Sequence, residues 1–178
     1  ATEDRSRRPD FQMVFQAPYA PLIPRFTVYA TLKEALQSRR KRTFAQTRDD
    51  VAELMEKVGL SPSLMRKYPH EFSGGQRQRV AIARALAPEP RLVIADEPVS
   101  ALDVSIQSQI LNLLIALARD LSLTMIFISH DLSVVHYIAD RIAVMRKGRI
   151  VEYGEADKVF SSPSHEYTQA HLAAVPRL

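Results

Sequence analysis

The stretch "RLVIADEPVSALDVSIQSQILNLLIALARDLSLTMIFIS", residues 91–129, decides the fold class. It begins with the apolar run 91–96 and ends with a second apolar run, 123–129, and each run has the length and composition of a strand covered on both faces. Between them, Ile110 and Leu114 belong to an apolar stripe at helical spacing. A strand, a helix and a strand in this order form a right-handed crossover between parallel strands, so the sequence predicts an α/β fold.

The chain on either side adds a helical block and a hairpin. Residues 10–16 alternate like a strand, and the prolines that follow predict a loop up to residue 25. From residue 26 to 87 the pattern is helical, and one helix is expected to begin at a capping box of Thr47 with Asp50 and to end at Gly59. After residue 129, Lys147-Gly148 predicts a hairpin, and two short helices are expected near 155–160 and 165–174.

Composition excludes several classes of protein. Of the 178 residues, 46% are hydrophobic and 25% charged, which suits one globular domain. The absence of cysteine excludes a disulfide framework, a cysteine zinc site and a thiol nucleophile. The net charge is +4, but the basic clusters carry no interleaved aromatic side chains that could stack on bases, so solvated basic faces are favoured and no nucleic-acid partner is expected.

Polar residues follow both predicted core strands. Asp96 and Glu97 end the first strand, and Ser129, His130 and Asp131 end the second. Parallel neighbours place these ends on one rim, where ligands of open sheets bind. A carboxylate such as Asp96 can hold Mg²⁺ together with phosphates, and Glu97 could orient or deprotonate a water. The alternative is a polar loop start, with Asp131 capping a helix and His130 filling a turn.

Ser73, Gly74 and Gly75 precede a basic, alanine-rich helical segment. A helix N-terminus presents free N–H groups and a partial positive charge, so this stretch predicts a phosphate site that the glycines leave open. The alternative is a serine N-cap followed by ordinary glycines.

Four motifs in order, "FSGGQ", "LVIADEP", "SALD" and "SHD", resemble the ATPase subunit of ATP-binding-cassette (ABC) transporters. The resemblance implies that the chain binds ATP and Mg²⁺ and hydrolyses ATP. It implies these roles: Gln16 as the Q-loop glutamine at Mg²⁺ and nucleotide, Ser73, Gly74, Gly75 and Gln76 as the signature motif, Asp96 as the Walker B aspartate that holds Mg²⁺, Glu97 as the catalytic base, Asp103 as the D-loop aspartate, and His130 as the switch histidine at the γ-phosphate.

The resemblance also implies the organisation of the chain. It predicts half of a P-loop NTPase-like parallel sheet with an inserted α-helical subdomain. The segments are a strand and Q-loop over 1–25, the helical signature subdomain over 26–87, the α/β core over 88–154 and a C-terminal segment over 155–178. In this family each ATP lies between the P-loop of one subunit and the signature helix of another, so a second ATPase subunit is an expected partner.

Two stretches are similar to the peptide (oligopeptide, dipeptide, nickel) importer branch: "FQAPYAPLIPR", 15–25, and "SPSHEYTQAHLAAVPRL", 162–178. The chain departs from that branch at Ala17, at 21–23 and at Glu166. The branch implies an ATPase that powers uptake of peptides or a related solute. It would lie peripherally on the cytoplasmic face of the inner membrane, with transmembrane permease subunits and, indirectly, an extracytoplasmic solute-binding protein.

No P-loop pattern G-x-x-x-x-G-K-[S/T] occurs among the five glycines, 59, 74, 75, 148 and 154. The N-terminal strands and P-loop of the family are therefore expected to be absent from this chain, either because it is a fragment or because the gene product is truncated. Two alternatives to the importer ATPase stay open: a catalytically incompetent fragment, and a non-transport ABC ATPase that acts in DNA repair or translation.

Overall fold

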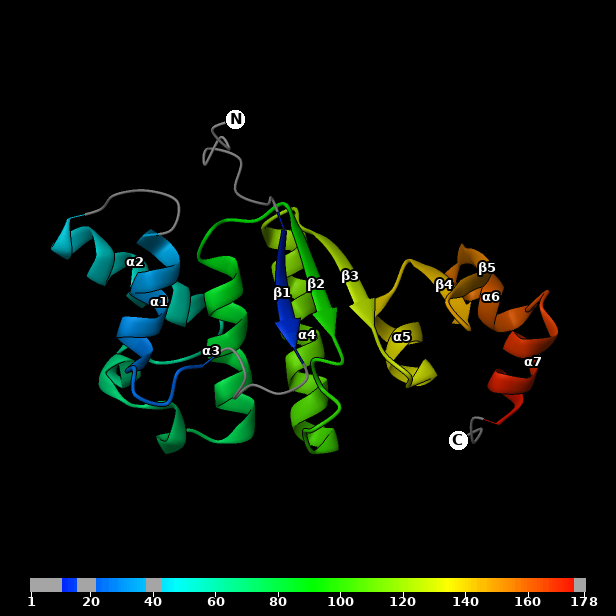
Figure 1. The fold of residues 1–178 in the computed structure, drawn as a ribbon, viewed down its shortest axis with the longest axis horizontal. Helices are drawn as coiled ribbons and strands as arrows, with labels where there is room; N and C mark the ends of the chain where they lie inside the picture. Colours follow the sequence, from blue (N-terminus) through cyan, green and yellow to red (C-terminus); the bar gives the residue numbers. More distant parts are fainter. Residues whose placement is uncertain (1–10, 16–21, 38–42, 175–178) are drawn as a thin grey trace. The chain divides into compact units, whose positions relative to one another are not determined.

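The computed structural model describes residues 11–15, 22–37 and 43–174 of the chain. These residues form two compact units, 1–126 and 127–178, and each unit is described by itself. Figure 1 shows the order of the elements along the chain. Within the described residues, no helix is long and apolar enough to cross a membrane.

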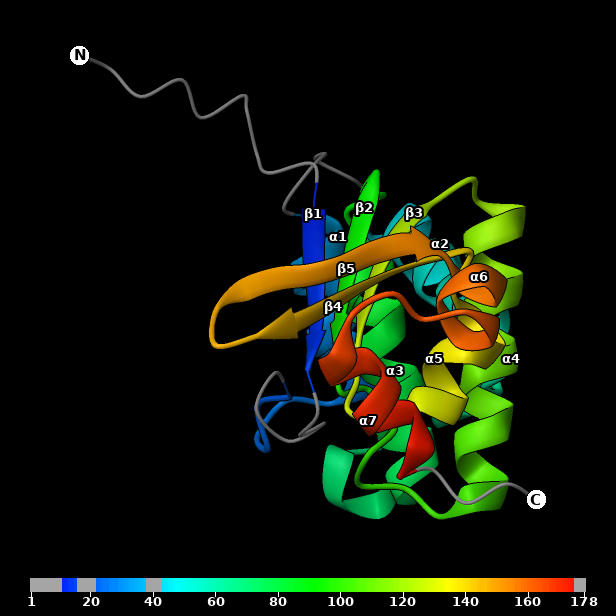
Figure 2. The same cartoon turned by 90° about the vertical axis from the view of Figure 1, so that its right-hand side faces the viewer.

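A parallel sheet organises the first unit. Its strands, in sheet order, are β1 (Phe11–Phe15), β2 (Leu92–Asp96) and β3 (Thr124–Ile128), the last of which runs past the end of the unit. β1 and β2 are paired in parallel, with Phe15 opposite Asp96. α4 (Val104–Asp120) connects β2 to β3 and runs along one face of the sheet (Figures 1 and 2). The predicted α/β fold with parallel strands is confirmed.

Three α-helices form a block beside the sheet (Figure 1). They are α1 (Val28–Gln37), α2 (Phe44–Lys57) and α3 (Gly74–Leu86), and the short 3₁₀ turns Pro62–Arg66 and Pro69–Glu71 lie between α2 and α3. Each helix buries apolar side chains, among them Leu32 of α1, Val51 and Met55 of α2, and Val80 and Ile82 of α3, each no more than 2% exposed. Burial of these side chains removes apolar surface from water and holds the block together.

The predicted start of α2 is wrong. The N-cap is Thr43, not Thr47, and its capping box uses Gln46 rather than Asp50. Thr47 lies inside the helix, 1% exposed, and its hydroxyl donates to the Thr43 carbonyl at 2.8 Å. Both threonines precede an acceptor side chain three residues on, so the sequence pattern fits either start, and burial of Thr47 decides between them. The predicted end is confirmed, because Gly59 has φ +70° directly after the C-cap residue Val58.

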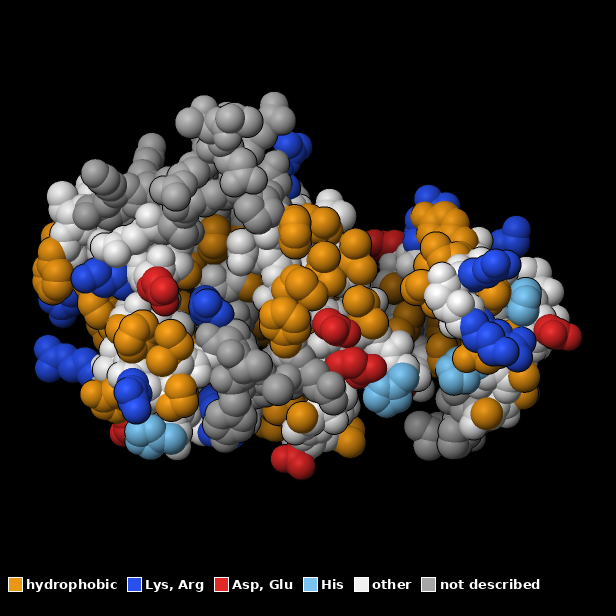
Figure 3. Space-filling view, in the orientation of Figure 1, with side chains coloured by type: hydrophobic (Ala, Val, Ile, Leu, Met, Phe, Trp, Pro, Cys, Tyr) orange, Lys and Arg blue, Asp and Glu red, His pale blue; other side chains and the backbone are white. Residues whose placement is uncertain are grey.

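In the part of the chain that the structure describes, helices cover one face of the sheet. Val14 of β1 is 1% exposed, whereas Phe11, Met13 and Phe15, on the opposite face of that strand, are 38–44% exposed. β3 was expected to be buried on both faces, and this is wrong: Ile126 is 48% exposed. Apolar side chains consequently gather on the surface over the sheet (Figure 3). Patches of this kind favour association with other surfaces.

α3 approaches α4 so closely that side chains must be absent at the contact. A Cβ on Gly75 would lie 2.6 Å from Ile106 Cγ2, and one on Gly74 would lie 3.3 Å from Leu102 Cδ2. Real Cβ atoms essentially never make a non-bonded contact as short as the first distance. The glycine pair therefore has a packing role that is independent of any ligand.

The second unit is built on an antiparallel hairpin (Figure 2). Its elements are α5 (Leu132–Ile138), β4 (Arg141–Arg146), β5 (Arg149–Glu155), α6 (Ala156–Ser161) and α7 (Glu166–Ala173). The hairpin turn has positive φ at Lys147 (49°) and at Gly148 (75°), as a two-residue primed turn requires, so the predicted hairpin is confirmed. Ile142, Ala156 and Val159 form its small core.

Glu152 of β5 fixes the segment that leads into α7. Its carboxylate accepts hydrogen bonds from the Ser164 backbone N–H (2.7 Å), the Ser164 hydroxyl (2.9 Å) and the His165 backbone N–H (3.2 Å). The neighbouring Thr168 hydroxyl has the largest effect on the pKa of Glu152, and together with these donors it lowers that pKa to about 2. The Thr168 hydroxyl itself lies outside ordinary hydrogen-bond geometry. Stabilisation of the ionised form is the cause.

The lowered pKa predicts a pH-dependent contribution of Glu152 to stability. Because the pKa falls from 4.5 to about 2 on folding, the contribution is complete above about pH 4.5 and is lost as the pH falls toward 2. Glu152→Gln should therefore unfold at a lower temperature than wild type at pH 7, and the difference should shrink from pH 4.5 downward. Thermal melts of both proteins over this range measure it, and a difference that stays constant down to pH 3 would exclude Glu152 as the titrating group.

The α3–α4 contact predicts an unusual response to a glycine substitution. Gly75→Ala should destabilise the protein by about 1–3 kcal/mol, because the added methyl group overpacks the contact with Ile106. In an Ile106→Ala background the same change should be neutral or stabilising, since alanine is the better helix former. Urea unfolding of the four proteins measures both effects, and an equal loss in the two backgrounds would contradict the packing explanation.

Candidate functional site

The chain leaves β2 in a strained turn that carries two carboxylates. Asp96 is the last residue of the strand, Glu97 follows it, and both are half-buried. Glu97 has φ +50°, a left-handed backbone conformation that residues other than glycine rarely adopt. Pro98 comes next, and a residue before proline normally prefers an extended backbone. The surrounding structure therefore imposes the conformation of Glu97, as is common at functional sites.

Hydrogen bonds hold the loop between Glu97 and α4. The Ser100 hydroxyl and backbone N–H donate to the Glu97 carbonyl, at 3.0 and 3.3 Å. The side-chain amide of Gln107, on α4, donates to the carbonyls of Val99 (3.1 Å) and Leu102 (3.0 Å). The loop ends at Asp103, the N-cap residue of α4, whose exposed side chain makes no capping hydrogen bond. Its carboxylate is therefore not committed to the helix.

The start of α3 is a complete reciprocal cap. The Ser73 hydroxyl accepts from the Gln76 backbone N–H (3.3 Å), and the Gln76 side chain accepts from the Ser73 backbone N–H (3.0 Å). The backbone N–H groups of Gly74 and Gly75 lie in the first turn, where no intrahelical acceptor exists. They are the donors that an anion could use, while the side chains of Ser73 and Gln76 are engaged with each other's backbone.

Arg79 ties α3 to the end of α2. Its guanidinium donates to the Val58 carbonyl at 2.7 Å, and a Cβ on Gly59 would lie 2.8 Å from the same nitrogen. The carbonyl belongs to the negative end of the α2 dipole, which a cation stabilises. The position of α3 is therefore restrained by α2 as well as by α4.

The predicted histidine lies in the second unit. His130 is exposed, and the Asp131 carboxylate caps α5 by accepting from the backbone N–H groups of Ser133 (2.9 Å) and Val134 (3.3 Å). The capping role that was considered for Asp131 is confirmed. Because Glu97 and His130 belong to different units, their convergence on one rim stays a prediction. Gln16 lies outside the described residues.

The Asp96–Glu97 turn suits a Mg²⁺ ion that is bound mainly by the phosphates of a nucleotide. Among the described residues, no three histidine, aspartate or glutamate side chains gather into a metal cluster. Asp96 offers hard carboxylate oxygens at the carboxyl end of β2, the type of donor that Mg²⁺ prefers. Magnesium commonly binds one or two carboxylates plus substrate phosphates, and the carboxylate of Asp96 matches that pattern.

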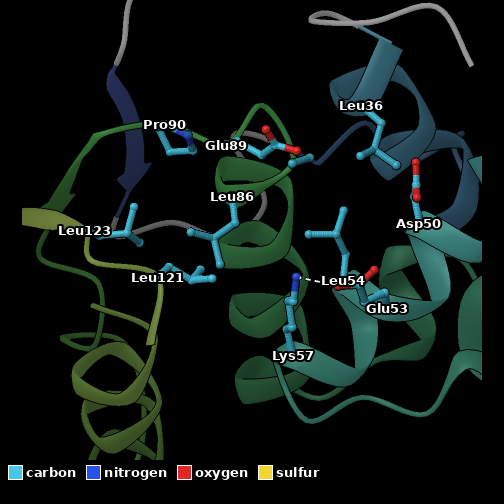
Figure 4. Close-up of a pocket in the computed structure, with 11 residues that line it drawn as sticks. Leu36, Asp50, Glu53, Leu54, Lys57, Leu86, Glu89, Pro90, Leu121 and Leu123 are labelled. Atoms are coloured by element: carbon cyan, nitrogen blue, oxygen red, sulfur yellow. Dashed lines mark ion pairs between the residues drawn. The ribbon is translucent and has the colours of Figure 1, made fainter. Parts of the chain in front are cut away.

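A pocket of about 300 Å³ lies at the other end of β2, where the strand begins (Figure 4). Its floor is mainly leucine, and its rim carries the Lys57–Glu53 ion pair, at 2.7 Å. The lining residues are Leu36, Asp50, Glu53, Leu54, Lys57, Leu86, Ala87, Glu89, Pro90, Leu121 and Leu123. None of the predicted site residues is among them, so this pocket is separate from the Asp96–Glu97 site.

Sequence reasoning missed the residues that hold the site in place. Ser100 and Gln107 hold backbone carbonyls of the loop between β2 and α4, and Arg79 holds a carbonyl at the end of α2. A sequence pattern does not reveal such partners. The strain at Glu97 was also hidden, because a glutamate before a proline predicts extended backbone. Only the glycine pair gave a signal of close approach.

The chain is similar in sequence to ATP-binding proteins of peptide transport systems. The chain is 53% identical over 177 residues to the oligopeptide transport ATP-binding protein OppF of Salmonella typhimurium, covering 99% of this chain and 53% of that protein. It is 52% identical over 172 residues to the dipeptide transport ATP-binding protein DppF of Haemophilus influenzae, covering 97% of this chain and 53% of that protein. The chain thus spans about half the length of the curated relatives it matches.

A solved structure and a family model agree with these relatives. The structure of cbiO1 from Clostridium perfringens, part of the ABC transporter complex cbiONQ, matches with a TM-score of 0.77 and 32% identity, over 86% of this chain and 60% of that one. The family model described as ABC transporter matches residues 1–100, which include the helical block, the capped start of α3 and the Asp96–Glu97 turn. The chain therefore belongs to the ABC transporter family.

Proposed function

We propose that this chain is part of the ATP-hydrolysing subunit of an importer that takes up peptides or a related solute. The observation that carries the proposal is Glu97, held in a left-handed conformation directly after Asp96 at the carboxyl end of β2. Similarity to oligopeptide and dipeptide transport ATP-binding proteins supports the solute class.

In this mechanism Glu97 is the general base. Its carboxylate takes a proton from the water that attacks the terminal phosphate, and the hydrogen bonds from Ser100 to its carbonyl keep its backbone in place. Asp96 would hold Mg²⁺, which, when bound, neutralises charge on the phosphates. The two neighbouring carboxylates therefore have separate tasks.

The remaining predicted residues act on the phosphates. The N–H groups of Gly74 and Gly75 would donate to the γ-phosphate of a nucleotide held by a second ATPase subunit, with Ser73 and Gln76 maintaining the helix cap. Asp103, the exposed N-cap of α4, would lie at the contact between the two subunits. His130 and Gln16 would contact the γ-phosphate and the Mg²⁺ site.

The proposed partners are transmembrane permease subunits, a second ABC ATPase subunit and, through the permease, an extracytoplasmic solute-binding protein. The proposed location is the cytoplasmic face of the inner membrane, where the protein would be peripheral. The alternatives are a catalytically incompetent fragment and a non-transport ABC ATPase, and the two experiments below separate them from the importer.

The role of Glu97 predicts the behaviour of an isosteric variant of the full-length protein. Glu97→Gln cannot take a proton, so turnover should fall by about 10²–10⁴, or roughly 3–5 kcal/mol of barrier. ATP binding should persist, and the ATP-bound dimer should accumulate. Steady-state ATPase rates and size-exclusion profiles with ATP measure these effects.

A matched control comes from the chain itself. Glu89 has the same side chain and a similar backbone conformation, φ +53°, but it lies at the pocket where β2 begins. Glu89→Gln should hydrolyse ATP at the wild-type rate, whereas Asp96→Asn should weaken nucleotide binding in the presence of Mg²⁺. Turnover of Glu97→Gln within a few-fold of wild type would remove Glu97 from the mechanism.

The permease subunits would contact the helical block, because the segment after Gln16 joins the predicted nucleotide site to this block. This contact predicts a crosslink from the block. Phe44 begins α2 and is 73% exposed, so a cysteine there should crosslink to a permease subunit in the assembled complex. A cysteine at the exposed Lys158 of α6 serves as the control and should not. Crosslinks only to nucleic acid, or none from either position, would count against a transport function.

A further inference from the structure

We infer that Gln107 is a positioning residue for Glu97: its side-chain amide holds the loop that presents this carboxylate. The inference rests on the proposed function, because it assigns Gln107 a part in ATP hydrolysis. Gln107 does not touch the reacting atoms and acts through the backbone of residues 99–102.

The geometry of the Gln107 amide uses its whole donor capacity. The nitrogen Nε2 lies 3.1 Å from the Val99 carbonyl oxygen and 3.0 Å from the Leu102 carbonyl oxygen. A side-chain amide has two N–H groups, and each carbonyl accepts one of them. Gln107 is half-buried and Val99 is 4% exposed, so water would not readily replace these bonds.

The bonds made by Gln107 continue to Glu97 through the loop. The Val99 carbonyl also accepts from the Leu102 backbone N–H (3.0 Å), which closes the turn. Ser100, inside that turn, holds the Glu97 carbonyl with its hydroxyl and its backbone N–H. A shift of the turn would therefore move Ser100 and release the backbone of Glu97 from its left-handed conformation.

Gln107 is itself anchored to a rigid element. It lies on α4, whose side chains Ile110, Leu111, Leu114 and Leu117 are buried. The residue before Gln107, Ile106, packs against Gly75 of α3. Because α4 is packed in place, the Gln107 amide restrains the position of the loop at residues 99–102. A residue that supports a catalytic group needs such a rigid base.

Three variants of the full-length protein test the inference. Gln107→Met keeps the length of the side chain and removes both donors, and Gln107→Glu is nearly isosteric but faces the two carbonyls with a carboxylate. The control is Gln109→Met, on the same helix, where the side chain is exposed. Gln107→Met should lower kcat by roughly ten-fold or more, as small displacements of catalytic groups do, and should leave the KM for ATP within about three-fold. Gln107→Glu should lose more, and Gln109→Met should match wild type.

A double-mutant cycle separates positioning of Glu97 from general support of the fold. In a Glu97→Gln background, Gln107→Met should not lower the residual hydrolysis further, because the group that it positions is already inactive. Its effect on the thermal unfolding midpoint should be the same in both backgrounds.

The outcomes distinguish the two proposals. Three outcomes would overturn the role of Gln107 and leave the ATPase proposal standing, provided that the wild-type protein hydrolyses ATP. They are a wild-type kcat in Gln107→Met, an equal loss of kcat in Gln109→Met, and losses of kcat that add in the Glu97→Gln/Gln107→Met double variant. A full-length wild-type protein that does not hydrolyse ATP would overturn both.

Discussion

The close approach of α3 to α4 is the constraint on which the first unit depends. The contact requires a residue without a side chain at Gly75, because Ile106 occupies the space that a Cβ would need. The contact joins the capped start of α3 to α4. α4 begins after Asp103, and the side-chain amide of Gln107 on this helix holds the preceding loop. Two predicted motifs that are far apart in the sequence thereby share one packing contact.

Two glutamates have the same rare left-handed backbone conformation, but different contacts account for it. Glu89 and Glu97 have φ of 53° and 50°, and they flank β2 at its two ends. Glu89 lies just beyond the end of α3, and its backbone N–H donates to the Leu86 carbonyl at 2.8 Å, so a local turn accounts for its conformation. Glu97 follows a strand and precedes a proline, so its conformation needs the loop contacts made by Ser100 and Gln107. The difference supports the proposal that Glu97, and not Glu89, acts in ATP hydrolysis.

The second unit shows a different use of a carboxylate. Glu152 accepts three hydrogen bonds from Ser164 and His165 and so attaches the segment before α7 to the hairpin. Arg146 lies over the Tyr167 ring, 4.9 Å from its centre, and adds a second attachment between the hairpin and α7. This small unit has a core of a few apolar side chains, and such polar contacts replace part of the packing that a larger core would supply.

The sequence by itself determined the fold class, the parallel strands, the hairpin turn and the family, because these follow from hydrophobic period, turn residues and motif order. The choice between Thr43 and Thr47 as the start of α2 needed the tertiary structure, since both satisfy the local pattern and only burial of Thr47 separates them. The exposure of Ile126 also depended on which faces the helices cover, which an apolar run does not specify. The left-handed Glu97 and the donors that hold its loop were decided by contacts between α4 and the loop, and local preference before Pro98 pointed the other way.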